Sequence, residues 1–228
     1  MPEPQPLGTG LAKRLSGILT ARGIASDACA HRDDIPGPKA ALEAAEARIP
    51  PRYRNAMADH PQVTQWIDGL IAAARRGPVG APDLARGGSL LIAGPTGTGK
   101  TYQAYGAVRG LLAAGVRLRW QALTASDLYA AQRPRHGSDS ERDLQALMRC
   151  PLLIVDDLGA AKTSEWTEEL TYRLVNYRYE QLLPTVFTTN LPIRDLREML
   201  GDRVASRLAE MTERVTLTGA DRRRQAAA

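Results

Sequence analysis

Residues 94–101, with the sequence Gly-Pro-Thr-Gly-Thr-Gly-Lys-Thr, constrain the fold more than any other part of the chain. The apolar run at residues 89–93 predicts a buried strand before them, and a helix is predicted from Tyr102 to Ala114. A strand, a glycine loop and a helix in this order match the pattern G-x-x-x-x-G-K-[ST] of a phosphate-binding loop. The alternative is a glycine-rich turn with an incidental lysine, but it leaves the placement of Lys100 unexplained in a chain with only three other lysines, Lys13, Lys39 and Lys162.

The residue types of this loop suit a nucleotide. Glycine permits backbone angles that a Cβ would forbid, so successive N–H groups can converge on an anion. Lys100 is expected to reach the β and γ phosphates, and the Thr101 hydroxyl to ligate Mg²⁺. The following helix adds the positive end of its dipole. The expected nucleotide-binding residues are Gly94, Pro95, Thr96, Gly97, Thr98, Gly99, Lys100 and Thr101.

A second informative stretch covers residues 151–159, where an apolar run ends in Asp156 and Asp157. The run predicts a buried strand whose carboxyl end brings both carboxylates toward the phosphates. Two acids could merely cap the following turn, but their position downstream of a phosphate loop favours a catalytic interpretation. Asp156 is then expected to hold Mg²⁺, and Asp157 to orient and deprotonate the water that attacks the γ phosphate.

Another strand is predicted at residues 184–190, and it ends in Asn190. An asparagine after a strand is commonly a turn residue. Its order after the two acids favours a second role, in which the amide holds the attacking water or a γ-phosphate oxygen.

Arg203 and Arg207 are four residues apart, so they share one face of a helix predicted to begin near Gly201. An ordinary solvated helix would explain this spacing. The functional interpretation is that one of the two reaches the nucleotide of a neighbouring subunit and stabilises transition-state charge.

Composition permits nucleic-acid binding without requiring it, because 228 residues carry a formal charge of +5 and a pI of about 9.5. No apolar run approaches the roughly 18 residues that span a bilayer, and the first residues do not resemble a signal peptide. Cys29 and Cys150 match no disulfide or metal spacing. These observations predict a cytoplasmic protein without membrane contact.

Periodicity and turn residues predict the remaining elements. Residues 7–22 predict an amphipathic helix, which either packs on its own domain or binds a partner. The segment before the first central strand is expected over the nucleotide base, where Tyr53 or Arg52 either contacts adenine or is a packing or surface residue. Further helices are expected at 39–48, 62–76, 124–132, 143–149, 165–183 and 193–200, strands at 116–123 and 214–218, polar or linking segments at 77–82 and 133–140, and a basic tail at 221–224.

The ordered set of residues 94–101, 152–159, 188–190 and 201–208, with Pro50-Pro51-Arg52-Tyr53, resembles the AAA+ ATPases of the DnaC/DnaI helicase-loader and IstB transposition-helper group. The resemblance covers residues 49–224. It implies that Asn190 is sensor 1, that Arg207 is a finger acting in trans, and that Arg203 is a second candidate. The expected fold is a doubly wound α/β P-loop domain with a largely parallel five-stranded sheet, no or minimal C-terminal lid, and a short helical N-terminal region without a cysteine-rich zinc module.

These expectations predict an ATPase domain at 49–228 and a partner-binding region at 1–48. The expected function is to load a replicative DNA helicase onto single-stranded DNA, using ATP and Mg²⁺, as a homo-oligomer forming a hexameric ring or spiral. Assistance to a transposase is the nearest alternative. A small-molecule kinase would need an acceptor pocket and a mobile lid, and a scaffold that binds ATP without turnover would not need Asp157 or Asn190.

Overall fold

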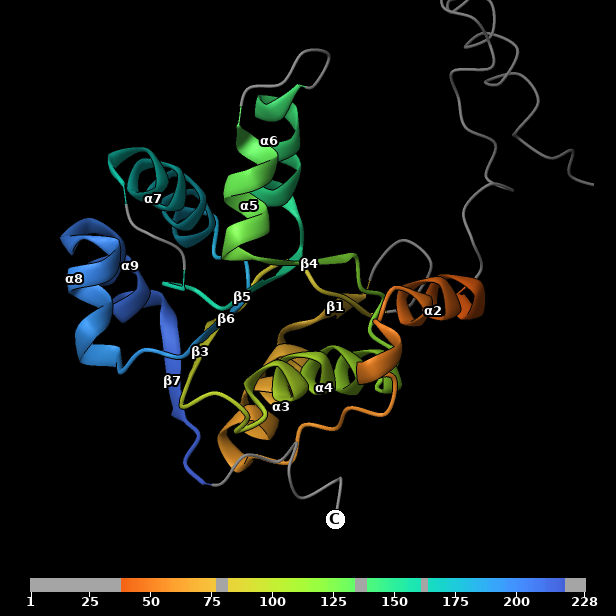
Figure 1. Ribbon diagram of the computed structural model, residues 1–228. Coiled ribbons are helices and arrows are strands. Elements are labelled where there is room, and N and C mark those ends of the chain that lie inside the picture. Colours follow the sequence, from red (N-terminus) through yellow and green to blue (C-terminus); the bar gives the residue numbers. More distant parts are fainter. Residues whose placement is uncertain (1–37, 77–81, 134–138, 161–163, 220–228) are drawn as a thin grey trace, which may run out of the picture. The chain divides into compact units, whose positions relative to one another are not determined.

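The computed structural model describes residues 38–76, 82–133, 139–160 and 164–219 (Figure 1). The chain divides into two compact units, residues 1–39 and 40–228, and the elements below belong to the second, apart from the first two residues of α2. The helix expected at 7–22, the tail at 221–224 and most of the segments expected at 77–82 and 133–140 lie outside the described residues. The division into domains at residues 48 and 49 therefore stays a prediction.

A five-stranded sheet forms the centre of the second unit, in the order β4-β5-β6-β3-β7, and all of its strand pairs are parallel. The predicted fold class is confirmed. β3, which precedes the glycine loop, lies between β6 and β7, so the carboxyl ends of β5, β6 and β3 meet at one edge. The strands are β3 (Ser89–Ala93), β4 (Trp120–Thr124), β5 (Leu152–Asp156), β6 (Thr185–Thr189) and β7 (Thr212–Thr216), and a separate antiparallel pair comprises β1 (Arg75–Arg76) and β2 (Pro82–Asp83).

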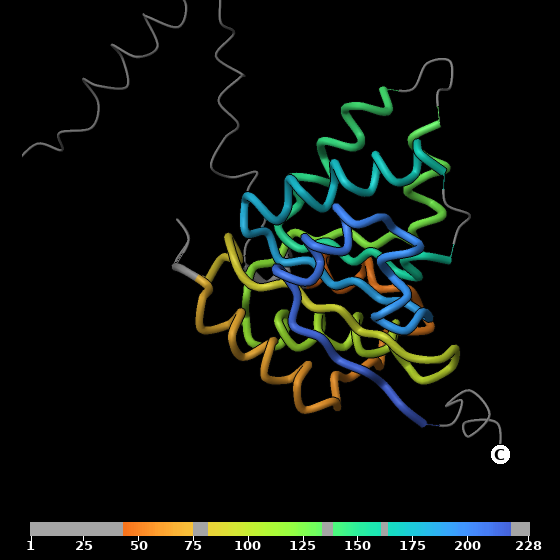
Figure 2. The backbone as a smooth tube through the Cα atoms, turned by 90° about the vertical axis from the view of Figure 1, so that its left-hand side faces the viewer, coloured from red at the N-terminus to blue at the C-terminus, as the bar shows by residue number. Residues whose placement is uncertain are grey.

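Alternating side chains of the strands build two cores, because successive residues of a strand point to opposite faces. Leu90 and Ile92 pack with α2, α3 and α4, whereas Leu91 packs with α5 to α9. Figure 2 shows α3 and α7 on opposite sides of the sheet. The helices are α2 (Pro38–Ala47), α3 (Pro61–Ala73), α4 (Lys100–Ala113), α5 (Ala125–Gln132), α6 (Ser140–Arg149), α7 (Glu165–Glu180), α8 (Leu196–Leu200) and α9 (Asp202–Met211), with 3₁₀ turns η3 (Pro51–Tyr53) and η4 (Ile193–Asp195).

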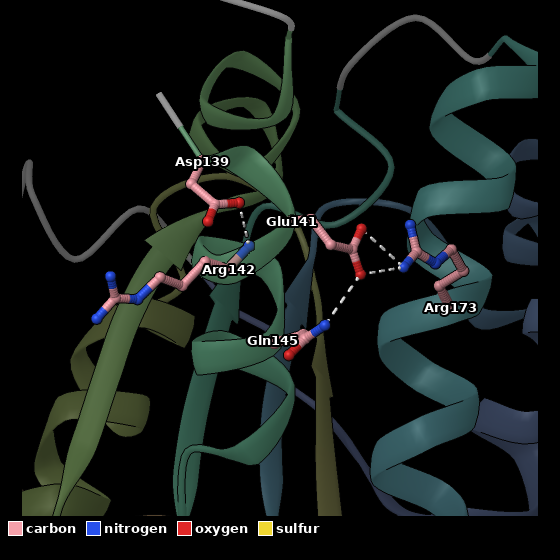
Figure 3. A network of polar contacts seen from close by, with 5 residues as sticks. All are labelled: Asp139, Glu141, Arg142, Gln145 and Arg173. Carbon is pink, nitrogen blue, oxygen red and sulfur yellow. Dashed lines mark hydrogen bonds and ion pairs between the residues drawn. The ribbon is translucent and has the colours of Figure 1, made fainter. Parts of the chain in front are cut away.

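Side-chain caps fix several helix ends. The Thr124 hydroxyl caps α5 by accepting a hydrogen bond from the Asp127 N–H at 3.0 Å. Asp139 caps α6 by accepting from the Arg142 N–H at 3.0 Å (Figure 3). Glu141 on α6 accepts two hydrogen bonds from Arg173 on α7, at 2.7 and 3.0 Å, which joins these helices at their surface.

None of the described helices is long and apolar enough to cross a membrane.

Several predicted boundaries were wrong. The helix expected at 62–76 ends at Ala73, with Arg75–Arg76 in β1, the helix expected at 143–149 begins at Ser140, and the strand expected at 214–218 spans 212–216. The strand expected from Val116 begins at Trp120, because the Val116 N–H still donates to Leu111 O at the end of α4 and pairing with β5 starts only at Trp120. Burial of Val116 and Leu118 produced the alternating pattern without a strand ladder. The helix expected to reach Leu183 ends at Glu180, since Leu182 takes a left-handed φ of 54° and reverses the chain before β6.

Candidate nucleotide-binding site

The loop between β3 and α4 adopts a conformation that its glycines permit. Gly97 and Gly99 have φ angles of 87° and 96°, in the region that residues with a Cβ rarely occupy. The Thr98 hydroxyl and the Lys100 ammonium both donate to Pro95 O, at 2.8 and 2.9 Å, and so hold the loop closed on itself. Lys100 is only 5% exposed. A buried cation in a glycine loop at the start of a helix suits a phosphate anion.

Asp156, the last residue of β5, meets Thr101 at the start of α4. The Thr101 hydroxyl lies 3.1 Å from each of the two carboxylate oxygens. Burial raises the pKa of Asp156, the neighbouring Asp157 carboxylate raises it further, and hydrogen bonds from Thr188 and Thr101 oppose the shift. An incompletely compensated carboxylate beside a hydroxyl fits Mg²⁺, which proteins bind through one or two carboxylates together with substrate phosphates. Within the described ranges no cluster of three or more acidic, histidine or cysteine ligands occurs.

Asp157 and Asn190 form the second polar pair of the site. The Asn190 amide donates to Asp157 Oδ1 at 3.1 Å. They are 33 residues apart in the sequence and meet because β5 and β6 are neighbours in the sheet. Asp157 has a left-handed φ of 55°, which is uncommon for a residue with a Cβ and is found at functional sites. A carboxylate and an amide at this distance can share one water molecule.

The loop and this pair line one cavity of about 520 Å³, a volume typical of a small-molecule site. Arg52 and Tyr53, the residues expected near adenine, lie on its wall. The lining comprises Arg52, Tyr53, Asp59, Thr96, Gly97, Gly99, Lys100, Thr101, Tyr102, Asp157 and Asn190. Among the residues expected to bind the phosphates, Gly94, Pro95 and Thr98 are not part of this lining and shape the loop from behind.

The wall formed by residues 52–60 is fastened to α4 by side chains that the sequence analysis missed. The buried Gln103 side chain accepts hydrogen bonds from the N–H groups of Asp59 and His60, both at 3.2 Å, and donates to the Asp59 carboxylate. The Tyr102 hydroxyl donates to Asn55 O at 2.8 Å. The signal in the sequence was a glutamine on the apolar face of a helix, since buried polar groups are almost always hydrogen-bonded.

An aromatic column supports Tyr53 from below. Its ring stacks on Tyr105, with centroids 4.7 Å apart, and Tyr105 in turn meets the edge of Trp120. Burial, followed by the Asp156 and Tyr53 charges, raises the pKa of Tyr105 to about 12, so the phenol stays neutral. Stacking on Tyr105 thus orients the Tyr53 ring at the cavity wall.

Arg203 and Arg207 lie on the face of α9 that packs on α7. The Arg203 guanidinium lies 3.7 Å from the Tyr172 ring centroid, and that of Arg207 lies 4.4 Å from the Tyr179 centroid. Arg207 Nε also donates to Asn176 Oδ1 at 3.1 Å. Neither arginine lines the described cavity of its own chain. The predicted contact with a neighbouring subunit's nucleotide stays a prediction.

Comparisons with known proteins agree with this site. Residues 85–226 match the family described as IstB-like ATP binding protein. The replicative helicase loader DnaC of Escherichia coli K12 is 26% identical over 157 residues, which are 68% of this chain and 57% of that protein. The putative ATP-binding protein of insertion sequence IS21 from Pseudomonas aeruginosa is 30% identical over 119 residues, or 52% of this chain and 44% of that protein.

A crystal structure of the DnaC helicase loader has a similar fold, with a TM-score of 0.61 and 26% sequence identity. The match covers 74% of this chain and 100% of that chain. The resemblance predicted from the motifs, and the AAA+ P-loop fold, are thereby confirmed. This chain spans little more than half of the length of the curated DnaC protein.

Proposed function

This chain belongs to the IstB-like ATP binding protein family, which consists of P-loop ATPases, and on that premise we propose that it hydrolyses ATP to load a replicative DNA helicase onto single-stranded DNA. The observation that carries the catalytic part is the Asp157–Asn190 pair, which opens into the same cavity as the Lys100 loop. A site that only bound nucleotide would need the loop but not this pair.

Each residue has a definite task in the proposed reaction. When bound, ATP supplies the phosphoanhydride bond and Mg²⁺ supplies positive charge at the phosphates. Lys100 and the loop N–H groups neutralise phosphate charge, and Thr101 with Asp156 holds the cation. Asp157 accepts a proton from the attacking water, which Asn190 orients. Arg207, or alternatively Arg203, comes from an adjoining subunit and stabilises the charge that develops in the transition state.

The partner assignment rests on the names and similarity of the relatives. We propose that residues 1–48 contact the helicase, that the ATPase domain starts at residue 49, and that several copies assemble into a ring or spiral in the cytoplasm around single-stranded DNA. The positive net charge suits a nucleic-acid backbone. Hydrolysis then releases or remodels the assembly.

The experiment is a Mg²⁺-dependent phosphate-release assay on the full chain, with and without a purified replicative helicase and single-stranded DNA. We expect turnover that Lys100→Ala abolishes and that helicase or DNA changes severalfold. Unimpaired turnover by Lys100→Ala would contradict the catalytic assignment.

A second candidate function is assistance to a transposase, favoured by the 30% identity to the IS21 protein. The two candidates are separated by adding, in parallel, a purified replicative helicase or a purified transposase of the IS21 type. Stimulation of the ATPase by the transposase alone would replace the first proposal with the second.

A further inference from the structure

Thr188, a fully buried residue of β6, contacts both acidic residues of the site with one hydroxyl group. Its Oγ1 donates to Asp156 Oδ1 and accepts the Asp157 N–H at 3.0 Å. A threonine hydroxyl has one proton and two acceptor positions, so an N–H donor leaves the proton for the carboxylate. One atom therefore fixes the side chain of the first acid and the backbone of the second.

Asp157 needs such support because its φ of 55° lies in a sparsely populated region for residues with a Cβ. Such conformations persist where the surroundings hold them in place. β6 holds this turn at successive positions: the Leu158 N–H donates to Thr188 O at 2.8 Å, and the Thr189 hydroxyl donates to Leu158 O at 2.7 Å. The turn directs the Asp157 carboxylate to Asn190.

Asp156 is constrained from two directions at once. Thr101 approaches it from α4 and Thr188 from β6. Only Thr101 lines the cavity, whereas Thr188 is enclosed in the sheet. The contact from Thr188 thus orients the carboxylate from behind, while Thr101 meets it from the cavity side.

We propose that Thr188 is a positioning residue of the ATPase, which orients Asp156 toward the cation site and sets the backbone of Asp157 so that its carboxylate faces Asn190. The inference rests on the proposed function. It differs from a packing role, because packing requires only the volume of the side chain, whereas positioning requires the hydroxyl.

The test compares Thr188→Val, which keeps the shape and removes the hydroxyl, with Thr188→Ser, which keeps the hydroxyl. Thr171→Val is the matched control, because Thr171 is also a buried threonine but its hydroxyl contacts the Tyr129 hydroxyl and Thr167 O, away from both acids. Thr188→Ala serves if the valine variant does not fold, as judged by its unfolding temperature.

Three quantities are measured on the full chain: kcat and KM for ATP with Mg²⁺, the metal-free affinity for ATP by calorimetry, and Mn²⁺ binding to the protein–nucleotide complex by electron paramagnetic resonance. Removing a side chain that orients a metal ligand by a hydrogen bond typically lowers activity or metal affinity about 10- to 100-fold. We expect Thr188→Val to lose that much kcat and Mn²⁺ affinity while metal-free ATP affinity stays within about twofold. Thr188→Ser should recover most of both losses.

Wild-type kcat and Mn²⁺ affinity in Thr188→Val would overturn the inference, as would equal losses in Thr171→Val or no recovery in Thr188→Ser. A wild-type chain that binds nucleotide without turning it over would instead contradict the proposed function. In that case the Mn²⁺ measurement still decides whether Thr188 orients Asp156.

Discussion

The guanidinium carbon of Arg207 lies 4.4 Å from the centre of the Tyr179 ring, so this arginine of α9 is stacked on α7 of its own chain. Tyr179 also donates to Glu210 Oε2 at 2.6 Å, and Arg207 Nη1 lies 3.8 Å from the same oxygen. These contacts hold the guanidinium on the α7–α9 surface and away from the cavity of the same chain. Any catalytic role of Arg207 therefore concerns another subunit.

Arg207→Ala should bind ATP with unchanged affinity and lose about 10³-fold in kcat, the scale of an arginine acting in trans. Mixing it with Asp157→Ala should restore partial phosphate release, since some junctions then pair an intact arginine with an intact acid. Absence of recovery at every mixing ratio would contradict action between subunits. Arg203→Ala is the companion variant: a comparable loss there, with Arg207→Ala fully active, would move the role to Arg203.

Asp157→Asn should keep nucleotide affinity and lose about 10²- to 10⁴-fold in kcat, because the amide cannot accept the proton that a carboxylate base accepts. Asn190→Ala should cause a smaller loss, since Asp157 remains and only the orientation of the water is impaired. Single-turnover phosphate release together with calorimetry separates chemistry from binding. The relative size of the two losses in kcat tests these roles. A larger loss in Asn190→Ala than in Asp157→Asn would contradict them.

Gln103→Leu should weaken ATP binding although Gln103 does not line the cavity. The substitution removes the acceptor of the part-buried N–H groups of Asp59 and His60, and each hydrogen bond of this kind contributes about 0.5–1.5 kcal/mol of stability. The wall that carries Tyr53 and Asp59 is then less firmly held. Calorimetry and urea unfolding measure the two effects, and Gln145→Leu, at an exposed glutamine of α6, is the control. Wild-type ATP affinity in Gln103→Leu would show that the Gln103 hydrogen bonds are not needed to hold this wall for nucleotide binding.

Arg178→Met should lower the free energy of unfolding by about 3–5 kcal/mol, because several buried carbonyl groups lose their donor at once. Arg178 is fully buried, and burial lowers its pKa to about 10, which leaves it charged at neutral pH. It donates to Thr185 Oγ1 and to the carbonyl oxygens of Leu147, Met148, Cys150 and Pro184, at 2.7 to 3.1 Å. These bonds join the end of α6 to the starts of β5 and β6.

Arg173→Ala is the matched control in the same helix, because its partner Glu141 is solvent-exposed (Figure 3). Exposed ion pairs contribute little to stability, so urea unfolding of this variant should resemble that of the wild type. An equal loss in both variants would contradict the role assigned to burial.

The sequence by itself determined the parts of the site that depend on neighbouring residues. The glycine loop, its lysine and the two acids at the end of β5 are contiguous motifs. Their backbone conformation follows from local residue types, such as the glycines with positive φ. The parallel fold class also followed, since buried strands that alternate with helices form parallel sheets.

Only the tertiary structure decided which side chains meet. Thr188 and Asp156 are 32 residues apart, and Gln103 and Asp59 are 44 apart. Their contacts depend on strand order, register and helix packing, and a threonine in a strand or a glutamine in a helix carries no local sign of its partner. The start of β4 was misjudged for the same reason, because burial gives an alternating pattern whether or not a neighbouring strand supplies hydrogen bonds. Local conformation is thus set by residues adjacent in the chain, and the positioning of the catalytic groups by contacts that form only when the sheet assembles.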